Sequence, residues 1–144
     1  MHRVLSRTPV VAANLGLADD VRCLIPAQIR SVKEDNCDYP GSGESGAGVL
    51  RNRLTLREGP GAIECERLGL ASHALQNALL QSVPPSPGKE PVNFIFPAWP
   101  KQWDAQFTLA ARDAFLISAS KEKGRIEFVE IHSNKGGQCR VKNP

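Results

Sequence analysis

The spacing of apolar residues changes near residue 83, and this change constrains the fold more than any other feature of the 144-residue chain. Before it, apolar residues recur every three or four positions, as in helices, and after it they alternate at the two-residue period of strands. The proline-rich stretch SVPPSPGKEP, residues 82–91, marks the change. Helices followed by strands are typical of the α+β class. We therefore expect helices in residues 1–83 and a small antiparallel β-sandwich in residues 84–144.

Two helices are expected near the N-terminus. The first has Thr8 as its N-cap, followed by a proline, and ends before Gly16. The second is capped by Asp19 or Asp20 and carries apolar residues at helical spacing. Pro26 lies within this pattern and removes one backbone donor, so the second helix should be kinked there.

A third helix is expected from about Glu66 to Ser82, with one apolar face and an acidic first turn that complements the helix dipole. A long glycine-rich segment, residues 33–62, precedes it. Within this segment GSGESG, residues 41–46, formally matches the dinucleotide fingerprint GxGxxG. No strand pattern comes before the glycines, so we interpret GSGESG as a flexible turn.

Five strand-like runs follow the proline-rich stretch, and turn residues separate them: residues 92–96, 106–111, 114–120, 125–133 and 139–143. In KEKGRI, residues 121–126, Gly124 supplies the positive φ of a hairpin turn. SNKGGQ, residues 133–138, has the composition of a second hairpin turn.

Composition favours an ordinary globular protein without a cofactor. The net charge of +3 comes from cations interleaved with 15 acidic residues, so we expect no nucleic-acid partner. No apolar run is long enough for a membrane span, and no targeting signal is recognisable, which leaves localisation open. The four cysteines, Cys23, Cys37, Cys65 and Cys139, lack CxxC spacing, so we expect free thiols and no metal site.

The C-terminal half carries an ordered series of short motifs: ALLQS (78–82), VNFIFPAWPKQW (92–103), AFLISAS (114–120), VEIHS (129–133) and CRV (139–141). This succession resembles the C-terminal end of glycoside hydrolase family 95, the α-L-fucosidase-like enzymes. The resemblance covers about residues 60–144 and, more loosely, residues 7–32 as the preceding helices of an (α/α)6 barrel. It implies hydrolysis of O-glycosidic bonds with inversion, and an oligosaccharide or polysaccharide substrate, in a full-length parent protein.

Inversion requires two groups on opposite sides of the anomeric carbon, about 6.5–9.5 Å apart, so that a water molecule fits between them. A complete barrel needs more helices than the sequence predicts, so the resemblance implies that the general acid lies outside this sequence. AIECERLG, residues 62–69, corresponds to a QIDANFG stretch of the family, and Glu64 and Glu66 are the candidate catalytic carboxylates there. Alternatively, both are carboxylates stabilised by the helix dipole. We expect His73, on the same helix, to be hydrogen-bonded rather than catalytic.

Trp99 and Trp103 lie in a short stretch rich in aromatic residues and proline. They are either a sugar-stacking platform or packing anchors between helices and strands. Prolines on both sides of Trp99 fix the chain direction, and indoles bury large apolar areas, so we expect anchors.

Two functions remain open. The first is a C-terminal fragment of a glycoside hydrolase, inactive alone, whose helices self-associate through apolar faces that lack their barrel neighbours. The second is a free-standing carbohydrate-binding or accessory module.

Overall fold

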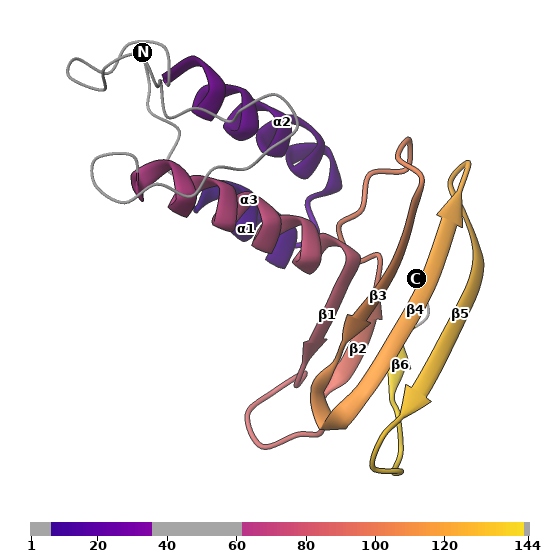
Figure 1. Cartoon of the computed structure of the whole chain (residues 1–144). Coiled ribbons are helices and arrows are strands. Elements are labelled where there is room, and N and C mark those ends of the chain that lie inside the picture. Colours follow the sequence, from indigo (N-terminus) through magenta and orange to yellow (C-terminus); the bar gives the residue numbers. More distant parts are fainter. Residues whose placement is uncertain (1–6, 36–61, 143–144) are drawn as a thin grey trace.

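The computed structural model describes residues 7–35 and 62–142, with side chains described for residues 7–29 and 69–142 (Figure 1). In these ranges the helices come first: α1 (Thr8–Asn14), α2 (Ala18–Asp35) and α3 (Ala62–Leu79). The strands follow: β1 (Leu80–Val83), β2 (Val92–Ile95), β3 (Ala105–Ala110), β4 (Phe115–Glu122), β5 (Arg125–Ser133) and β6 (Val141–Lys142), with a short 3₁₀ turn, η1 (Arg112–Ala114), before β4. The fold belongs to the α+β class, as the change of period predicted.

Both ends of α1 follow from backbone hydrogen bonds. The carbonyl of Arg7 accepts the first helical bond, so Arg7, and not Thr8 as expected, occupies the N-cap position. At the other end Gly16 adopts a φ of +76°, and Leu17 N–H donates to Ala12 O at 2.9 Å. This arrangement confirms the glycine stop predicted from the sequence.

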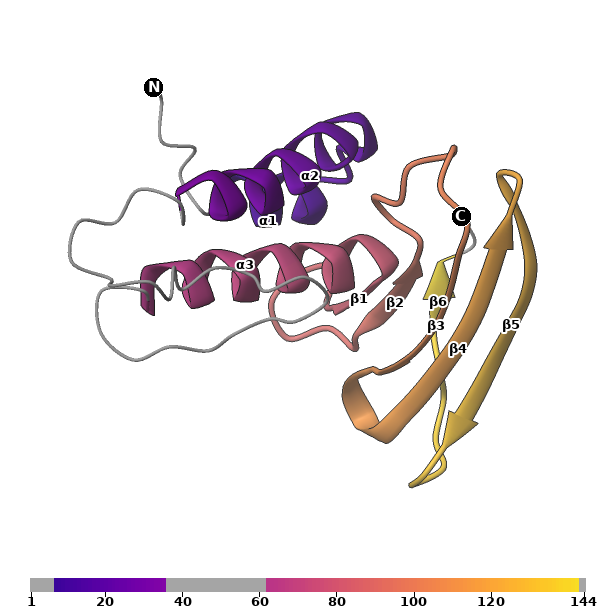
Figure 2. The same cartoon turned by 45° about the horizontal axis from the view of Figure 1, so that its top comes forward.

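The helices pack through small side chains. Figure 2 shows α1 and α2 along the same side of α3. The helices bury a cluster of Ala12, Ala13, Val21, Ile25, Ala74 and Ala78. Ala98, from the turn after β2, also belongs to this cluster. Alanines on α1 and α3 allow these two helices to approach closely, because no long side chain separates their backbones.

The third helix ends earlier than the sequence predicted. It stops at Leu79 instead of Ser82, and the next four residues form β1. β1 pairs antiparallel with β2, from Leu80 opposite Ile95 to Val83 opposite Val92. The backbone of residues 80–83 therefore pairs with a neighbouring strand and does not continue the helix. The boundary that we expected at residue 83, between helices and strands, instead lies between two strands, β1 and β2, that pair with each other.

The strands form two sheets in the described chain, ordered β1-β2-β6 and β3-β4-β5. Side chains from both sheets meet in one buried cluster: Leu80, Ile95, Phe96, Phe107, Ile117 and Ala119. The pairs β3–β4 and β4–β5 are antiparallel, as predicted. The pair β1–β2 is also antiparallel, but β1 was expected to be part of the third helix. The prediction is wrong for β6, which runs parallel to β2 with Asn93 opposite Val141.

The two glycine-containing turns behave differently. Lys123 and Gly124 have φ angles of +50° and +80° and connect β4 to β5, which confirms the first hairpin turn. The second expected hairpin is wrong, because β6 does not return along β5. Gly136, at φ +73°, lies in a connection that carries the chain across to the other sheet, where β6 pairs with β2.

Backbone hydrogen bonds join the end of α3 to the turn after β2. The last carbonyl groups of a helix have no partner within the helix. Here Phe96 N–H donates to Leu79 O at 2.7 Å, and Ala98 N–H donates to Ala78 O at 3.3 Å. The turn after β2 therefore caps α3, and the sheet β1-β2-β6 begins where the helix ends.

Trp99 lies at this junction and packs against both buried clusters. Its Nε1–H donates to the carbonyl oxygen of Trp103 at 2.9 Å. The two indoles meet edge to face, with centroids 5.4 Å apart and planes at 70°. Both side chains are half-buried, so the structure places Trp99 as a packing anchor and not in a flat exposed platform.

Replacing Trp99 by alanine should therefore lower the free energy of unfolding by about 3 kcal/mol, because both clusters lose contacts. Urea denaturation followed by circular dichroism measures this change. Val11→Ala is the control, since Val11 is 52% exposed and its truncation should cost no more than about 0.5 kcal/mol. Equal midpoints for the two variants would contradict the anchor role.

Candidate binding site

The expected catalytic carboxylates lie far from the strands. Glu64 and Glu66 belong to the N-terminal part of α3, and their side chains lie outside the described residues. Along the helix axis Glu66 is about 20 Å from Leu79, where α3 ends. The structure therefore leaves their catalytic role untested and separates them from the pocket at the other end of α3.

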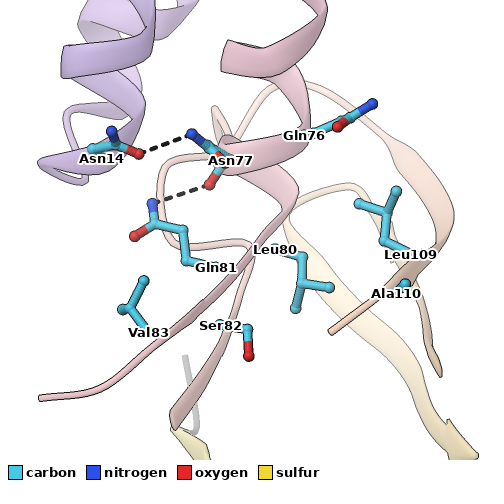
Figure 3. A pocket seen from close by; sticks show the side chains of 9 residues that line it. All are labelled: Asn14, Gln76, Asn77, Leu80, Gln81, Ser82, Val83, Leu109 and Ala110. Atoms are coloured by element: carbon cyan, nitrogen blue, oxygen red, sulfur yellow. Dashed lines mark hydrogen bonds between the residues drawn. The ribbon is translucent and has the colours of Figure 1, made fainter. Parts of the chain in front are cut away.

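That pocket lies where α1, α3, β1 and β3 meet and has a volume of about 320 Å³ (Figure 3). Its polar lining contains four carboxamides and one hydroxyl: Asn14, Gln76, Asn77, Gln81 and Ser82. Leu80, Leu109 and neighbouring small apolar side chains complete its wall. Gln76 and Asn77 are adjacent in sequence, but nothing in the sequence places Asn14 or Gln81 beside them.

Gln81 holds the pocket together. In a continuing helix its backbone N–H would donate to Asn77 O, but residue 81 already belongs to β1. The side chain replaces that donor, and Gln81 Nε2 lies 3.0 Å from Asn77 O. The same nitrogen lies 2.8 Å from Ala13 O, near the end of α1. One amide group therefore satisfies terminal carbonyls of two helices.

Three of the other four polar side chains of the pocket, Asn14, Asn77 and Ser82, form hydrogen bonds. Asn77 Nδ2 donates to Asn14 Oδ1 at 2.9 Å, and the Oγ of Ser82 accepts a hydrogen bond from Arg112 N–H at 3.1 Å. Gln76 is exposed and forms no hydrogen bond with a described residue. No titratable side chain lines this pocket in the described chain. The side chains of its described lining therefore offer hydrogen bonds to hydroxyl or amide groups.

His73 lies on α3 and is exposed, and no described residue forms a hydrogen bond with it. The hydrogen bond expected for this side chain is therefore not seen within residues 7–35 and 62–142.

Cys23 and Cys139 are free thiols, and Asn93 Nδ2 lies 3.3 Å from the Sγ of Cys139. Cys37, the side chain of Cys65 and the GSGESG stretch lie outside the described residues. Within the described ranges no three His, Cys, Asp or Glu side chains gather in a way that suits a metal ion. The described helices include none with the length and apolar character needed to cross a membrane.

Comparison with known proteins adds no assignment to this geometry. No family model, no curated protein and no solved structure matches the chain.

Replacing Gln81 by methionine should lower the free energy of unfolding by about 1–3 kcal/mol, because Asn77 O and Ala13 O both lose the hydrogen bond from Gln81, and Ala13 O keeps only the one from Gly16 N–H. Gln76→Met is a matched control, since Gln76 lines the same pocket without a hydrogen bond to a described residue. Thermal melts of both variants measure the difference. If both variants melt at the same temperature, Gln81 does not hold the helix ends together.

Proposed function

We propose that this chain is the C-terminal part of an α-L-fucosidase-like glycoside hydrolase of family 95. In this proposal α1, α2 and α3 are the last helices of an (α/α)6 barrel, and the strands form a β-sandwich that closes its end. The parent protein hydrolyses O-glycosidic bonds of an oligosaccharide or polysaccharide. The chain alone is inactive, and its strands have a structural role.

One observation carries the proposal: apolar side chains are exposed on and just after α1. Val11 is 52% exposed, Leu15 is 67% exposed and Leu17 is 45% exposed. The same helix buries Ala12 and Ala13 against α3. A surface helix usually presents polar residues to water, whereas a helix that is apolar on several sides is typical of one with neighbours on several sides. A helical barrel supplies such neighbours.

The chemistry of the described pocket agrees with a structural role. Its amides connect α1, α3 and β1, and its described lining lacks a group able to transfer a proton. Proton transfer is therefore assigned to carboxylates elsewhere in the parent. Glu64 and Glu66 remain the candidates that this chain supplies. Unpaired apolar surface on α1 also supports self-association of the isolated chain.

A second candidate function, a free-standing carbohydrate-binding module, is favoured by the outer face of the sheet β3-β4-β5. Gln106 lies opposite Ser120, and Thr108 lies opposite Ser118 with their hydroxyls 2.8 Å apart. Phe128 lies opposite Ser120 on the same face and is 41% exposed. Uncharged hydrogen-bonding groups beside an exposed aromatic ring suit a sugar ring.

The size of the native protein separates the two functions. An antibody raised against the purified chain should detect, in the source cells, a protein much larger than 15.6 kDa. The immunopurified larger protein should hydrolyse an aryl α-L-fucoside or α-galactoside, and the purified chain should not. Lysate depleted with the same antibody is the control.

An antigen of 15.6 kDa that binds oligosaccharides would contradict the first function and favour the second. Hydrolysis by the purified chain, abolished in a Glu64→Gln or Glu66→Gln variant, would also contradict it, because the chain would then contain its own catalytic groups.

A further inference from the structure

A second pocket, about 620 Å³ in volume, lies between the turn after β2 and the β4–β5 hairpin. Three cationic side chains line it: Lys101, Lys121 and Arg125. Two aromatic side chains, Phe96 and Trp99, form part of its wall. No carboxylate belongs to its described lining.

Lys121 occupies a position that an apolar residue would normally fill. It continues the inward-facing row of β4 that begins with Phe115, Ile117 and Ala119, and it is 9% exposed. Its Nζ lies 5.6 Å from the centroid of the Phe96 ring. Burial, together with the nearby charge of Lys101, lowers the pKa of Lys121 below its ordinary value. An ammonium group at such a position is unfavourable without a compensating charge.

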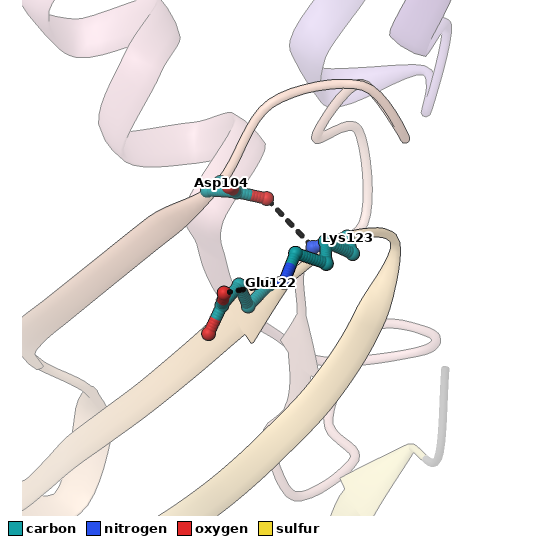
Figure 4. Close-up of polar contacts among 3 residues, drawn as sticks. All are labelled: Asp104, Glu122 and Lys123. Atoms are coloured by element: carbon teal, nitrogen blue, oxygen red, sulfur yellow. Dashed lines mark hydrogen bonds and ion pairs between the residues drawn. The ribbon is translucent and has the colours of Figure 1, made fainter.

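The described residues supply no such charge. None of Lys101, Lys121 and Arg125 forms an ion pair with a described carboxylate. Figure 4 shows two acids near the hairpin turn, Asp104 and Glu122, both in contact with Lys123. Asp104 Oδ1 accepts a hydrogen bond from Lys123 N–H at 2.7 Å, and Glu122 Oε1 lies 3.3 Å from Lys123 Nζ. Among the described residues, no ion pair therefore balances the positive charge of the pocket.

The wall of the pocket is held in place before any ligand binds. Phe96 has a φ of +54°, which a bulky residue rarely adopts, and its N–H donates to Leu79 O at 2.7 Å. Its ring also meets Phe107 edge to face, with centroids 5.3 Å apart. Strained backbone held by its surroundings is frequent in binding sites. Lys121 is held in the central strand β4, opposite Ala105 on one side and Ile126 on the other.

We propose that this pocket binds a small organic anion, whose carboxylate, sulfate or phosphate group contacts Lys121 and Arg125 while an attached ring lies against the aromatic wall. A guanidinium and an ammonium group together suit an oxyanion. The volume is within the usual range for small-molecule sites. The cations converge on one pocket instead of spreading along a surface, which favours a small anion over a polyanion. This inference does not depend on the proposed glycosidase parent.

Binding is measured by calorimetric titration of the intact chain with glucuronate, glucose 6-phosphate, inorganic phosphate and glucose. Both sugar anions should bind saturably and more tightly than inorganic phosphate, and glucose should not bind. Lys121→Met should weaken the affinity at least about tenfold. Lys123→Met is the matched control, because it removes the same charge from the same hairpin outside the pocket, and it should change the affinity less than about twofold.

Arg125→Gln provides an independent test, because Arg125 is exposed and its replacement leaves the buried row of β4 intact. It should also weaken binding by about tenfold or more, with an unchanged melting temperature. Equal losses in the Lys121 and Lys123 variants would overturn the site, since general electrostatics would then explain the binding. Inorganic phosphate binding as tightly as the sugar anions would overturn the ring contact. Binding to heparin or an oligonucleotide, but to none of the small anions, would overturn the proposal as a whole.

Discussion

The carbonyl groups at the C-terminal end of α3 determine how the helices and strands are joined. A helix leaves its last carbonyls without partners, and burying them unpaired is costly. In this chain the N–H groups of Phe96 and Ala98 satisfy two of them, and the Gln81 amide satisfies a third. All three donors lie in or beside the sheet β1-β2-β6. The helix end therefore sets the position of that sheet.

The two pockets depend on this junction. Gln81 lines the carboxamide-rich pocket between α1, α3, β1 and β3. Its backbone belongs to β1, while its side chain still donates to Asn77 O at the end of α3. On the other side, the bond of Phe96 to the end of α3 holds its ring beneath Lys121. Trp99, between the two clusters, joins the helical and strand packing. A change at the end of α3 is therefore expected to affect both pockets together.

Local patterns predicted the elements that depend on neighbouring residues. The sequence predicted the strand runs from the two-residue spacing of apolar side chains. It predicted the Gly124 hairpin and the end of α1 from the ability of glycine to adopt a positive φ. The strand β1 was missed because its short apolar run also fits a helix, and only pairing with β2 decides between them.

Three features depend on residues distant in sequence: the parallel position of β6, the bond of Gln81 to Ala13 O, and the gathering of Lys101, Lys121 and Arg125 around one pocket. A pattern of neighbouring residues contains no signal for these contacts.

The most direct test of the junction is native-state hydrogen exchange at the amide of Phe96, compared with Ile117 in the central strand β4. If α3 and the strands form one cooperative unit, both amides should exchange with the same free energy of opening, that of global unfolding. Rapid exchange of Phe96 while Ile117 stays protected would show that the helix end and the sheet separate independently, and would contradict the account.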